Sequence, residues 1–178
     1  MPIEIERKFL VSDDSWRIGA MEPVRITQGY FSRQDRLIGR VRKIGGRAFL
    51  AIKEKKVGLS RHEFEYETPN EDAEEMLALF CKDALIHKDR FTSRFDGKPW
   101  TIDVFDGDNK GLVVAEIELE SENEKVSLPT WIGADITGVA RYRNSNLARF
   151  PFQAWSRPED WTGRQLESLR AGHIAIKC

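Results

Sequence analysis

The chain has 178 residues, a length that suits one domain, and 40% of them are hydrophobic, which is enough for a core and argues against disorder. Its 28 basic and 29 acidic residues leave a net charge of −1. We therefore expect no general attraction to nucleic acid or to anionic membranes. Charged residues make up 32% of the chain, above the usual quarter, so their placement carries the functional information.

The cysteines and histidines give no sign of a disulfide framework or a zinc site. Cys81 and Cys178 lie far apart and outside any ligand-like pair. The three histidines are His62, His87 and His173. No apolar run is long enough to span a bilayer, and the N-terminus is charged from Glu4 onward. The expectation is a soluble, cytoplasmic protein without a membrane partner.

The first two thirds of the chain read as strands, in eight segments. Gly45-Gly46 joins the third segment to the fourth, and Asp96-Gly97-Lys98 joins the sixth to the seventh, as hairpin turns. The expected strands are residues 3–11, 24–33, 36–44, 47–55, 61–68, 86–95, 99–105 and 112–120.

Three segments read as helix. Residues 12–20 suggest a short helix capped by Ser12 or Asp13. Asn70 can cap a second helix with an acidic first turn, whose apolar stripe includes Cys81 and predicts core packing. We expect one domain over 1–178: a barrel over about 2–122 and a C-terminal helical segment over about 130–175. A helix at 159–171 would belong to that segment, and Trp155 and Trp161 would cover the barrel.

One face of most strands is charged, because side chains alternate with a period of two. For a single strand, the simplest reading of such a face is exposure to water. Both signs recur on strand after strand in equal numbers, and the opposite faces are apolar, as in Ile52 and Phe64. This pattern favours an α+β, mainly antiparallel fold: a closed eight-stranded β-barrel with a charged lumen and helices packed outside. The charged residues are Glu4, Glu6, Lys8, Arg40, Arg42, Lys53, Glu63, Glu65, Lys88, Arg90, Arg94, Asp103, Glu116 and Glu118.

Carboxylates and cations in one lumen indicate a ligand that is both polyanionic and metal-bound. Hard divalent ions prefer carboxylate oxygen, arginine binds phosphate bidentately and lysine acts as a point charge. Two Mg²⁺ or Mn²⁺ ions would add about +4, close to the charge of an ionised triphosphate.

The same residues resemble the motifs of the CYTH superfamily, the triphosphate tunnel metalloenzymes, over about residues 2–148. Two departures are Ala51, where the family often has threonine, and Asp135-Ile136-Thr137, where it usually has E-V-T. The matching stretches are Glu4-Ile-Glu6-Arg-Lys8 (E-x-E-x-K), Arg40-Val-Arg42, Lys53, Arg61-His-Glu63-Phe-Glu65, Lys88-Asp-Arg90, Trp100 to Asp103, Ala115-Glu116-Ile-Glu118-Leu and Arg141-Tyr142-Arg143-Asn144.

The resemblance implies an antiparallel eight-stranded tunnel that cleaves triphosphates with Mg²⁺ or Mn²⁺, and it implies three sets of roles. The metal ligands would be Glu4, Glu6, Asp103, Glu116 and Glu118. The phosphate-binding residues would be Lys8, Arg40, Arg42, Lys53, Lys88 and Arg90. Glu63, Glu65 and Asp103 would bind a second metal ion or position water. Our own hypothesis takes Glu63, Glu65 and Lys8 as catalytic, with Glu63 or Glu65 accepting the proton of the attacking water.

The working hypothesis is hydrolysis of inorganic triphosphate, or a related small polyphosphate, by a monomer or homodimer. A class IV-type adenylate cyclase and a thiamine triphosphatase remain alternatives, since both belong to this superfamily. A non-catalytic polyphosphate- or nucleotide-binding module is a third, although simple anion binding needs no carboxylates. Tyr30 is as well explained by packing as by substrate contact.

Overall fold

A computed structural model describes residues 3–34, 37–54, 60–82 and 84–155. Within these ranges nine strands form one antiparallel sheet, in the order β5-β4-β3-β2-β6-β7-β8-β1-β9. The strands are β1 (Ile3–Val11), β2 (Val24–Gln34), β3 (Leu37–Ile44), β4 (Arg47–Glu54), β5 (Ser60–Thr68), β6 (Leu85–Phe95), β7 (Lys98–Phe105), β8 (Val113–Glu118) and β9 (Ile132–Asp135). The eight predicted strands are therefore present, with bounds within two residues of the predicted ones.

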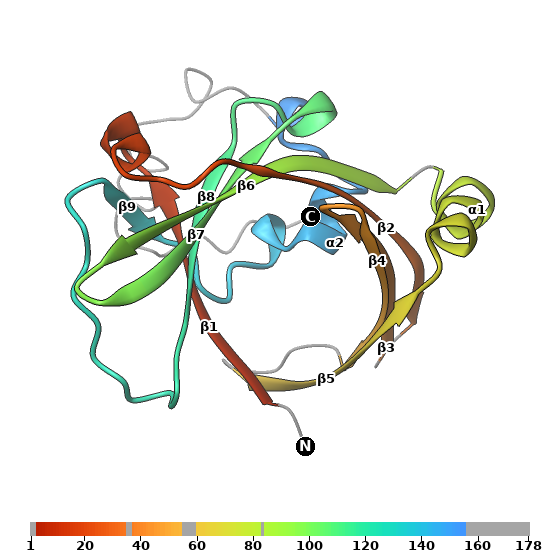
Figure 1. The fold of residues 1–178 in the computed structure, drawn as a ribbon, viewed down its shortest axis with the longest axis horizontal. Coiled ribbons are helices and arrows are strands. Elements are labelled where there is room, and N and C mark those ends of the chain that lie inside the picture. The colour runs from red at the N-terminus through yellow and green to blue at the C-terminus, as the bar shows by residue number, and fades with distance from the viewer. Residues whose placement is uncertain (1–2, 35–36, 55–59, 83, 156–178) are drawn as a thin grey trace.

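The sheet curves around an open centre, and its two sides meet where β5 pairs with β1 (Figure 1). This contact joins Ile3 to His62, Glu4 to Arg61 and Ile5 to Ser60, whereas β1 pairs with β8 from Glu6 onward. The antiparallel, mainly β architecture is confirmed. A fully closed eight-stranded barrel stays a prediction, because the β1–β5 contact covers only these three pairs.

Both predicted hairpin turns are present. Gly45 and Gly46 adopt φ values of 56° and 84°, and Asp96 and Gly97 adopt 51° and 75°. Two successive residues with positive φ give the turn whose twist matches that of the flanking strands. These turns fix the registers β3–β4 and β6–β7 and thereby decide which charged side chains face one another.

The region after β8 differs from the helical segment predicted for 130–175. Residues 132–135 form β9, which extends the sheet beside the C-terminal half of β1. Only single turns of helix follow within the described residues: η3 (Ala140–Tyr142), α2 (Asn144–Leu147) and η4 (Phe152–Ala154). The helix predicted at 159–171, with Trp161, lies outside the described residues.

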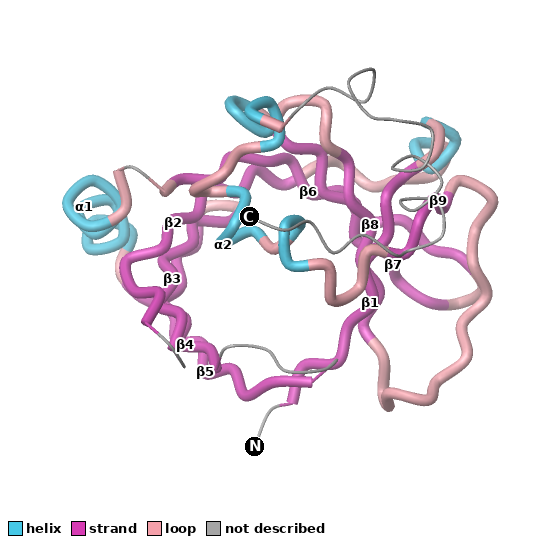
Figure 2. Tube along the Cα trace, turned by 180° about the vertical axis from the view of Figure 1, so that it is seen from behind, coloured by secondary structure: helices cyan, strands magenta, loops and turns pink. Residues whose placement is uncertain are grey.

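We call residues 136–147 the cover segment, because η3 and α2 lie across the opening ringed by the strands (Figure 2). The cover segment begins on β1, where the Ile136 amide donates to the Lys8 carbonyl at 2.9 Å and the Lys8 amide donates to Thr137 Oγ1 at 3.0 Å. Its apolar side chains Ile136, Tyr142 and Leu147 are buried in one cluster with Tyr30 and Ile86.

Helix α1 (Asn70–Phe80) packs on the outside of the sheet (Figure 1). Pro69 occupies the N-cap position of this helix, so the predicted Asn70 cap is wrong. The side-chain amide of Asn70 instead donates to the Gly46 carbonyl at 2.7 Å. The predicted core role of Cys81 is confirmed by its burial against Leu77 and Val41.

The predicted short helix is η1 (Asp14–Arg17), capped by the Asp13 side chain. A last 3-10 turn, η2 (Gly107–Asn109), precedes β8. None of the helices in the described ranges is long and apolar enough to cross a membrane.

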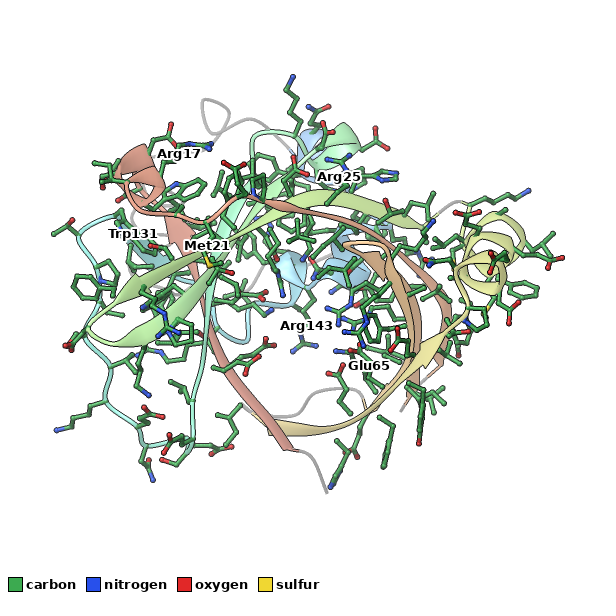
Figure 3. The ribbon with its side chains drawn as sticks, viewed as in Figure 1. Arg17, Met21, Arg25, Glu65, Trp131 and Arg143 are labelled. Carbon is green, nitrogen blue, oxygen red and sulfur yellow. The ribbon has the colours of Figure 1, made fainter. Side chains whose placement is uncertain are left out.

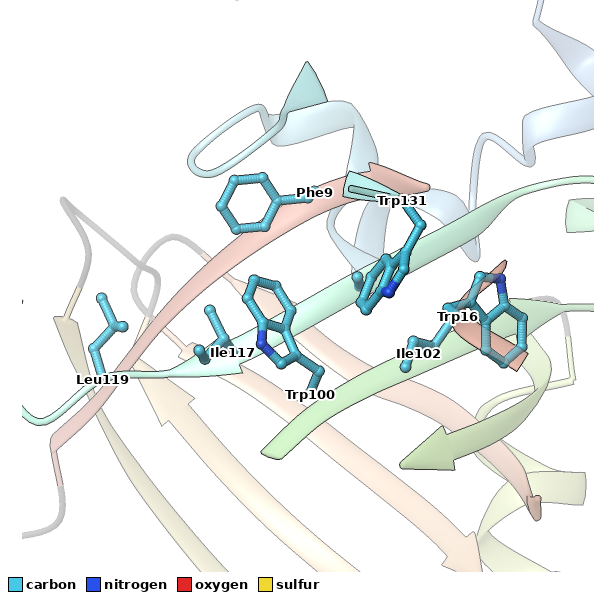
Figure 4. Packing of buried hydrophobic residues seen from close by; sticks show 8 residues of the cluster. Phe9, Trp16, Trp100, Ile102, Ile117, Leu119 and Trp131 are labelled. Carbon is cyan, nitrogen blue, oxygen red and sulfur yellow. The ribbon is translucent and has the colours of Figure 1, made fainter. Parts of the chain in front are cut away.

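The apolar outer face of the sheet is covered only in part. Over β1, β7 and β8 it forms a packed cluster in which Trp100 lies against Phe9 and Trp131 (Figure 4). Over β4 and β5, Ile52, Phe64 and Tyr66 are exposed. The expectation that helices and the C-terminal segment cover the outer face is therefore wrong for this part of the described residues, because α1 packs on β2, β3 and β4 and leaves these side chains uncovered.

Gly29 on β2 allows α1 to approach the sheet closely. A Cβ atom at this position would stand 2.3 Å from the Cβ of Cys81 and 2.9 Å from a methyl group of Leu77. Gly29→Ala should therefore lower the free energy of unfolding by about 1–3 kcal/mol through overpacking. Urea denaturation of both proteins measures the difference, and an unchanged free energy would show that α1 is not held against β2.

Candidate functional site

The inward faces of the strands surround a cavity of about 460 Å³ that is lined almost entirely by charged and polar side chains. Figure 3 shows Glu65 pointing into this space from β5 and Arg143 from the cover segment. A second, smaller space of about 70 Å³ lies between the strands and the cover segment and shares Glu6, Lys8, Arg40 and Lys53 with the first. The two spaces form one continuous site that is narrow beneath the cover.

The strand registers place opposite charges next to each other. Lys8 pairs with Glu116 across β1 and β8, Arg90 with Asp103 across β6 and β7, and Lys53 with Glu63 across β4 and β5. Directly opposite side chains on one face of an antiparallel pair lie about 4.5–5.5 Å apart at Cβ. Each of these three registers therefore forms an ion pair without any help from a loop.

One group of ion pairs centres on Asp103 of β7, whose side chain is 1% exposed. Lys88 donates to one oxygen of this carboxylate, and Arg90 binds it bidentately with both distances at 2.7 Å. Arg90 also donates to Glu116 at 3.0 Å, and Lys8 bridges Glu116 to Glu6, whose oxygen lies 3.3 Å from its ammonium group. The group thus links β1, β6, β7 and β8.

A second group lies across the cavity on β3, β4 and β5. Arg40 donates to Glu63 at 3.2 Å and to Glu65 at 2.7 Å. Arg42 donates to Glu65 at 2.8 Å, and Lys53 pairs with Glu63. Arg40 and Lys53 are buried although both are charged. Two walls of opposite-charge pairs therefore face each other across one space.

The surroundings shift the pKa values of these groups in opposite directions. Burial disfavours the charge on Glu116 and Asp103, but the adjacent cations outweigh it, so the pKa of each carboxyl lies below its usual value. Burial likewise opposes the charge on Lys8, and Glu116 with Glu6 outweighs it, so the pKa of Lys8 is raised. Burial lowers the pKa of Lys88 to about 8, and the positive charge of Arg90 adds to this effect despite Asp103.

At Arg42 the neighbouring charges do not outweigh the effect of burial, in contrast to Glu116 and Asp103. Burial lowers its pKa, and the like charges of Arg40 and Arg90 lower it further, while Glu65 only partly compensates. A guanidinium group stays protonated at ordinary pH, so Arg42 is a buried cation with like charges nearby and one carboxylate partner in Glu65. The cavity is therefore better suited to binding an additional anion than an additional cation on this wall.

The carboxylates suit a hard divalent metal ion more than a soft one. Glu6 stands directly opposite Glu118 across β1 and β8, and both line the same cavity as Glu116. Oxygen donors of this type match Mg²⁺ or Mn²⁺ and not the nitrogen and sulfur preference of zinc. No three His, Cys, Asp or Glu side chains in the described residues gather closely enough to hold a metal. Glu116, Asp103 and Glu63 are each paired with a cation in this structure.

Most of the predicted site residues meet in this cavity. Those lining it are Glu6, Lys8, Arg40, Arg42, Lys53, Glu63, Glu65, Lys88, Arg90, Glu116 and Glu118. Asp103 lies behind this lining as the buried partner of Lys88 and Arg90, and the Glu4 side chain is outside the description. Arg94 is exposed near its hairpin, where it donates to the Gly97 carbonyl at 3.3 Å, so its predicted place in the lumen is wrong.

Several lining residues were missed by the sequence pattern. Gln28 of β2 is buried in the cavity wall and donates to the Tyr30 hydroxyl at 2.8 Å. Its position two residues before Tyr30 places both on the inward face, which is a signal that alternation alone could have given. Arg143 and Asn144 reach the site from the cover segment, and no strand pattern could have placed them there.

The curved antiparallel sheet and the cations and carboxylates on its inward face are the features expected of a protein that binds a small, highly charged ligand. A family model for the CYTH domain matches residues 2–150, so the chain belongs to the CYTH family, and the recognition from its motifs is confirmed.

Relatives and solved structures agree with this membership. The chain is 43% identical over 151 residues to a protein of Acetivibrio thermocellus named inorganic triphosphatase, covering 84% of this chain and 96% of the relative. A protein of Nitrosomonas europaea with the same name is 34% identical over 149 residues, covering 82% and 96%. A solved structure of an inorganic triphosphatase matches with a TM-score of 0.62 at 30% identity, covering 84% of this chain and 96% of that one.

Removal of the Asp103 charge should destabilise the fold more than removal of a surface charge. Asp103→Asn leaves Lys88 and Arg90 without their shared carboxylate, and breaking a buried ion pair in this way costs about 3–5 kcal/mol. Asp89→Asn is the matched control, because Asp89 on the same strand as Lys88 forms only an exposed pair with Arg25, worth about 1 kcal/mol or less. Equal losses in urea denaturation would contradict this account of the Asp103 pairs.

The Lys88 side chain should titrate near pH 8. The folded protein releases this proton at about pH 8, whereas the unfolded chain keeps it up to about pH 10.5. The unfolded state therefore binds more protons in this window, and Lys88 makes the free energy of unfolding rise with pH between 8 and 10.5. NMR of lysines labelled at Cε should show one resonance with a midpoint near 8 that is missing in Lys88→Met. Titration of every lysine above pH 10 would refute it.

Proposed function

We propose that this protein hydrolyses inorganic triphosphate within the cavity, with Mg²⁺ or Mn²⁺ as cofactor. The observation that carries the proposal is the convergence of six cations and the surrounding carboxylates, from β1 and β3–β8, on one enclosed space. The names of the two relatives and of the similar solved structure support inorganic triphosphate as the substrate. Among the described residues that line the larger cavity only Ile44 and Pro99 are apolar, so this cavity offers little surface on which a nucleoside base would stack.

The cations would bind the phosphoryl groups by exchanging partners. Lys8, Arg40, Arg42, Lys53, Lys88 and Arg90 are held in place by carboxylates, and phosphate oxygens offer them a second set of acceptors. Because the ion pairs already fix these side chains around the cavity, substrate binding requires little additional ordering of the protein.

The carboxylates released by this exchange would hold the metal ions. We assign Glu4, Glu6, Asp103, Glu116 and Glu118 to this role. Glu6 and Glu118 stand opposite each other by register and both line the cavity. Asp103 would reach a metal ion once Lys88 and Arg90 turn toward the substrate. Bound metal ions would lower the pKa of a water molecule and neutralise charge on the phosphoryl oxygens.

The hydrolytic step needs a group that accepts the proton of the attacking water, and we assign this role to Glu63 or Glu65. Both project into the cavity and both are paired with Arg40. When a phosphoryl group takes up this arginine, a glutamate becomes free to accept the proton while water attacks the terminal phosphorus in line. The bond from that phosphorus to the bridging oxygen breaks, and Lys8 on the opposite wall, with its raised pKa, stabilises the charge on the leaving pyrophosphate.

The proposal includes a closed tunnel of eight strands, with β9 added outside it. The β1–β5 contact would complete the ring and exclude bulk water from one side of the site. A lower local dielectric strengthens every charge interaction with the phosphoryl groups.

A substrate panel tests the function. With Mg²⁺ or Mn²⁺ the protein should release phosphate from inorganic triphosphate, with little release from ATP or thiamine triphosphate, no cyclic nucleotide, and no activity in EDTA. Glu6→Gln should lower kcat by about 100- to 1000-fold, since metal binding supplies several kcal/mol of transition-state stabilisation.

Glu67→Gln is the control for Glu6→Gln, because Glu67 forms an exposed pair with Arg47 on β4 and should leave turnover unchanged. Circular dichroism should show that both variants remain folded. Full activity of Glu6→Gln would reject the metal-ligand role, and cyclic nucleotide as the main product would reject hydrolysis.

A further inference from the structure

Arg143 differs from the six cations of the strands. Each of those six is paired with a carboxylate, whereas the Arg143 side chain makes no ion pair or hydrogen bond within the described residues. It is partly buried, lines the narrow part of the site and points into the space ringed by the strands (Figure 3). A partly buried cation without a counter-charge is unfavourable and gains by binding an anion.

The cover segment fixes the direction of this side chain. Arg141, two residues earlier, stacks on Trp155 with its guanidinium carbon 3.6 Å from the ring centroid. Tyr142 between them is buried and packs edge-on against the same tryptophan. The carbonyl of Arg143 accepts the Asn146 and Leu147 amides at 2.7 and 2.9 Å, which begins α2. The backbone at Arg143 is therefore held firmly while its side chain remains available to a ligand.

The space beneath the cover is smaller than the adjoining cavity, with a volume of about 70 Å³ against about 460 Å³. Its lining combines the cations Lys8, Arg40, Lys53 and Arg143 with apolar side chains such as Ile38 and Val139. A phosphoryl group is small enough to enter it, and the cations offer donors to its oxygens. The end group of a linear polyphosphate also carries more charge than an inner one, so it is the best match for an unpaired arginine.

We infer that Arg143 binds the terminal phosphoryl group of a linear polyphosphate that enters the site end-first and stops against the cover segment. This inference rests on the proposed function, to which it adds an orientation for the substrate. Lys8, Arg40 and Lys53, which line both spaces, bind the next phosphoryl group, and Arg42, Lys88 and Arg90 line only the larger space. The terminal phosphorus that water attacks is then the one at the opposite end of the substrate, in the larger space that Glu63 and Glu65 line. The cover segment thereby sets how far the end of the substrate enters the site.

Binding and turnover of three variants test the role of Arg143. Arg143→Ala should weaken calorimetric binding of inorganic triphosphate in EDTA by about tenfold to a hundredfold, the range for a lost charge-assisted hydrogen bond. KM measured with Mg²⁺ should rise by a similar factor. Arg143→Lys should recover most of this loss because it keeps the charge. Arg149→Ala is the control, since Arg149 lies on the same stretch of chain but is exposed and absent from the site.

The outcomes separate this inference from the proposed function. Tight binding of triphosphate without phosphate release would end the proposed hydrolysis, yet a weaker Arg143→Ala complex would still establish the contact. Binding and KM within twofold of the parent in Arg143→Ala would overturn the inference. An equal loss in Arg149→Ala would also overturn it, because the effect would then be a diffuse potential. A thermal unfolding curve for each variant distinguishes lost binding from lost folding.

Discussion

The structure depends on the mutual neutralisation of charges that its strands bury. Taking one carboxylate or ammonium group out of water costs several kcal/mol, and only close, well-formed pairs offset this. Asp103 illustrates the condition: it is almost fully enclosed and is contacted by two cations, one of them bidentate. If the register between β6 and β7 slipped by one residue, Arg90 would face the wrong side of the sheet. The ion pairs therefore select the register as much as the apolar outer face does.

The same pairs prepare the site for its ligand. Each cation that we assign to phosphate binding is already held in the cavity by a carboxylate that we assign to the metal ions or to the attacking water. Binding of a metal-bound polyanion would exchange one set of opposite-charge contacts for another, and the net charge of the site would change little. Arg42, with its lowered pKa, and Arg143, without a partner in the described part of the chain, are the positions where this balance is incomplete. An incomplete balance in favour of positive charge is what draws an anion into the cavity.

Alternation along the strands predicted most of the inward face, with Arg94 as the exception, and it was not enough to predict the rest of the site. Lys8, Arg40 and Glu63 could be placed on one face because a strand has a period of two. The pairing of Lys53 with Glu63 could not be predicted, because it depends on the register between β4 and β5. The sequence between these strands contains no tight-turn signal that would fix this register. The stretch Arg141 to Asn144 was matched to a family motif, but its place in a segment that covers the cavity was not predicted, because single turns of helix have no periodic signature. The exposed Ile52 and Phe64 were mistaken for buried residues, because an apolar face on a strand does not reveal whether anything covers it.

Strand β1 connects the charged cavity to the cover segment. Lys8 points into the cavity, while its backbone amide and carbonyl bind Thr137 and Ile136 at the start of the cover. On the outer face of the same strand, Arg7 pairs with Asp135 at 2.6 Å, and Asp135 accepts the Thr137 amide at 2.8 Å. This arrangement explains how the chain departs from the usual E-V-T stretch without losing the site. The carboxylate at position 135 faces away from the cavity and anchors the cover, and an aspartate is long enough to do so. Asp135 thus contributes to the site indirectly: it holds the start of the cover segment against β1 and thereby helps to fix the position of Arg143 relative to Lys8.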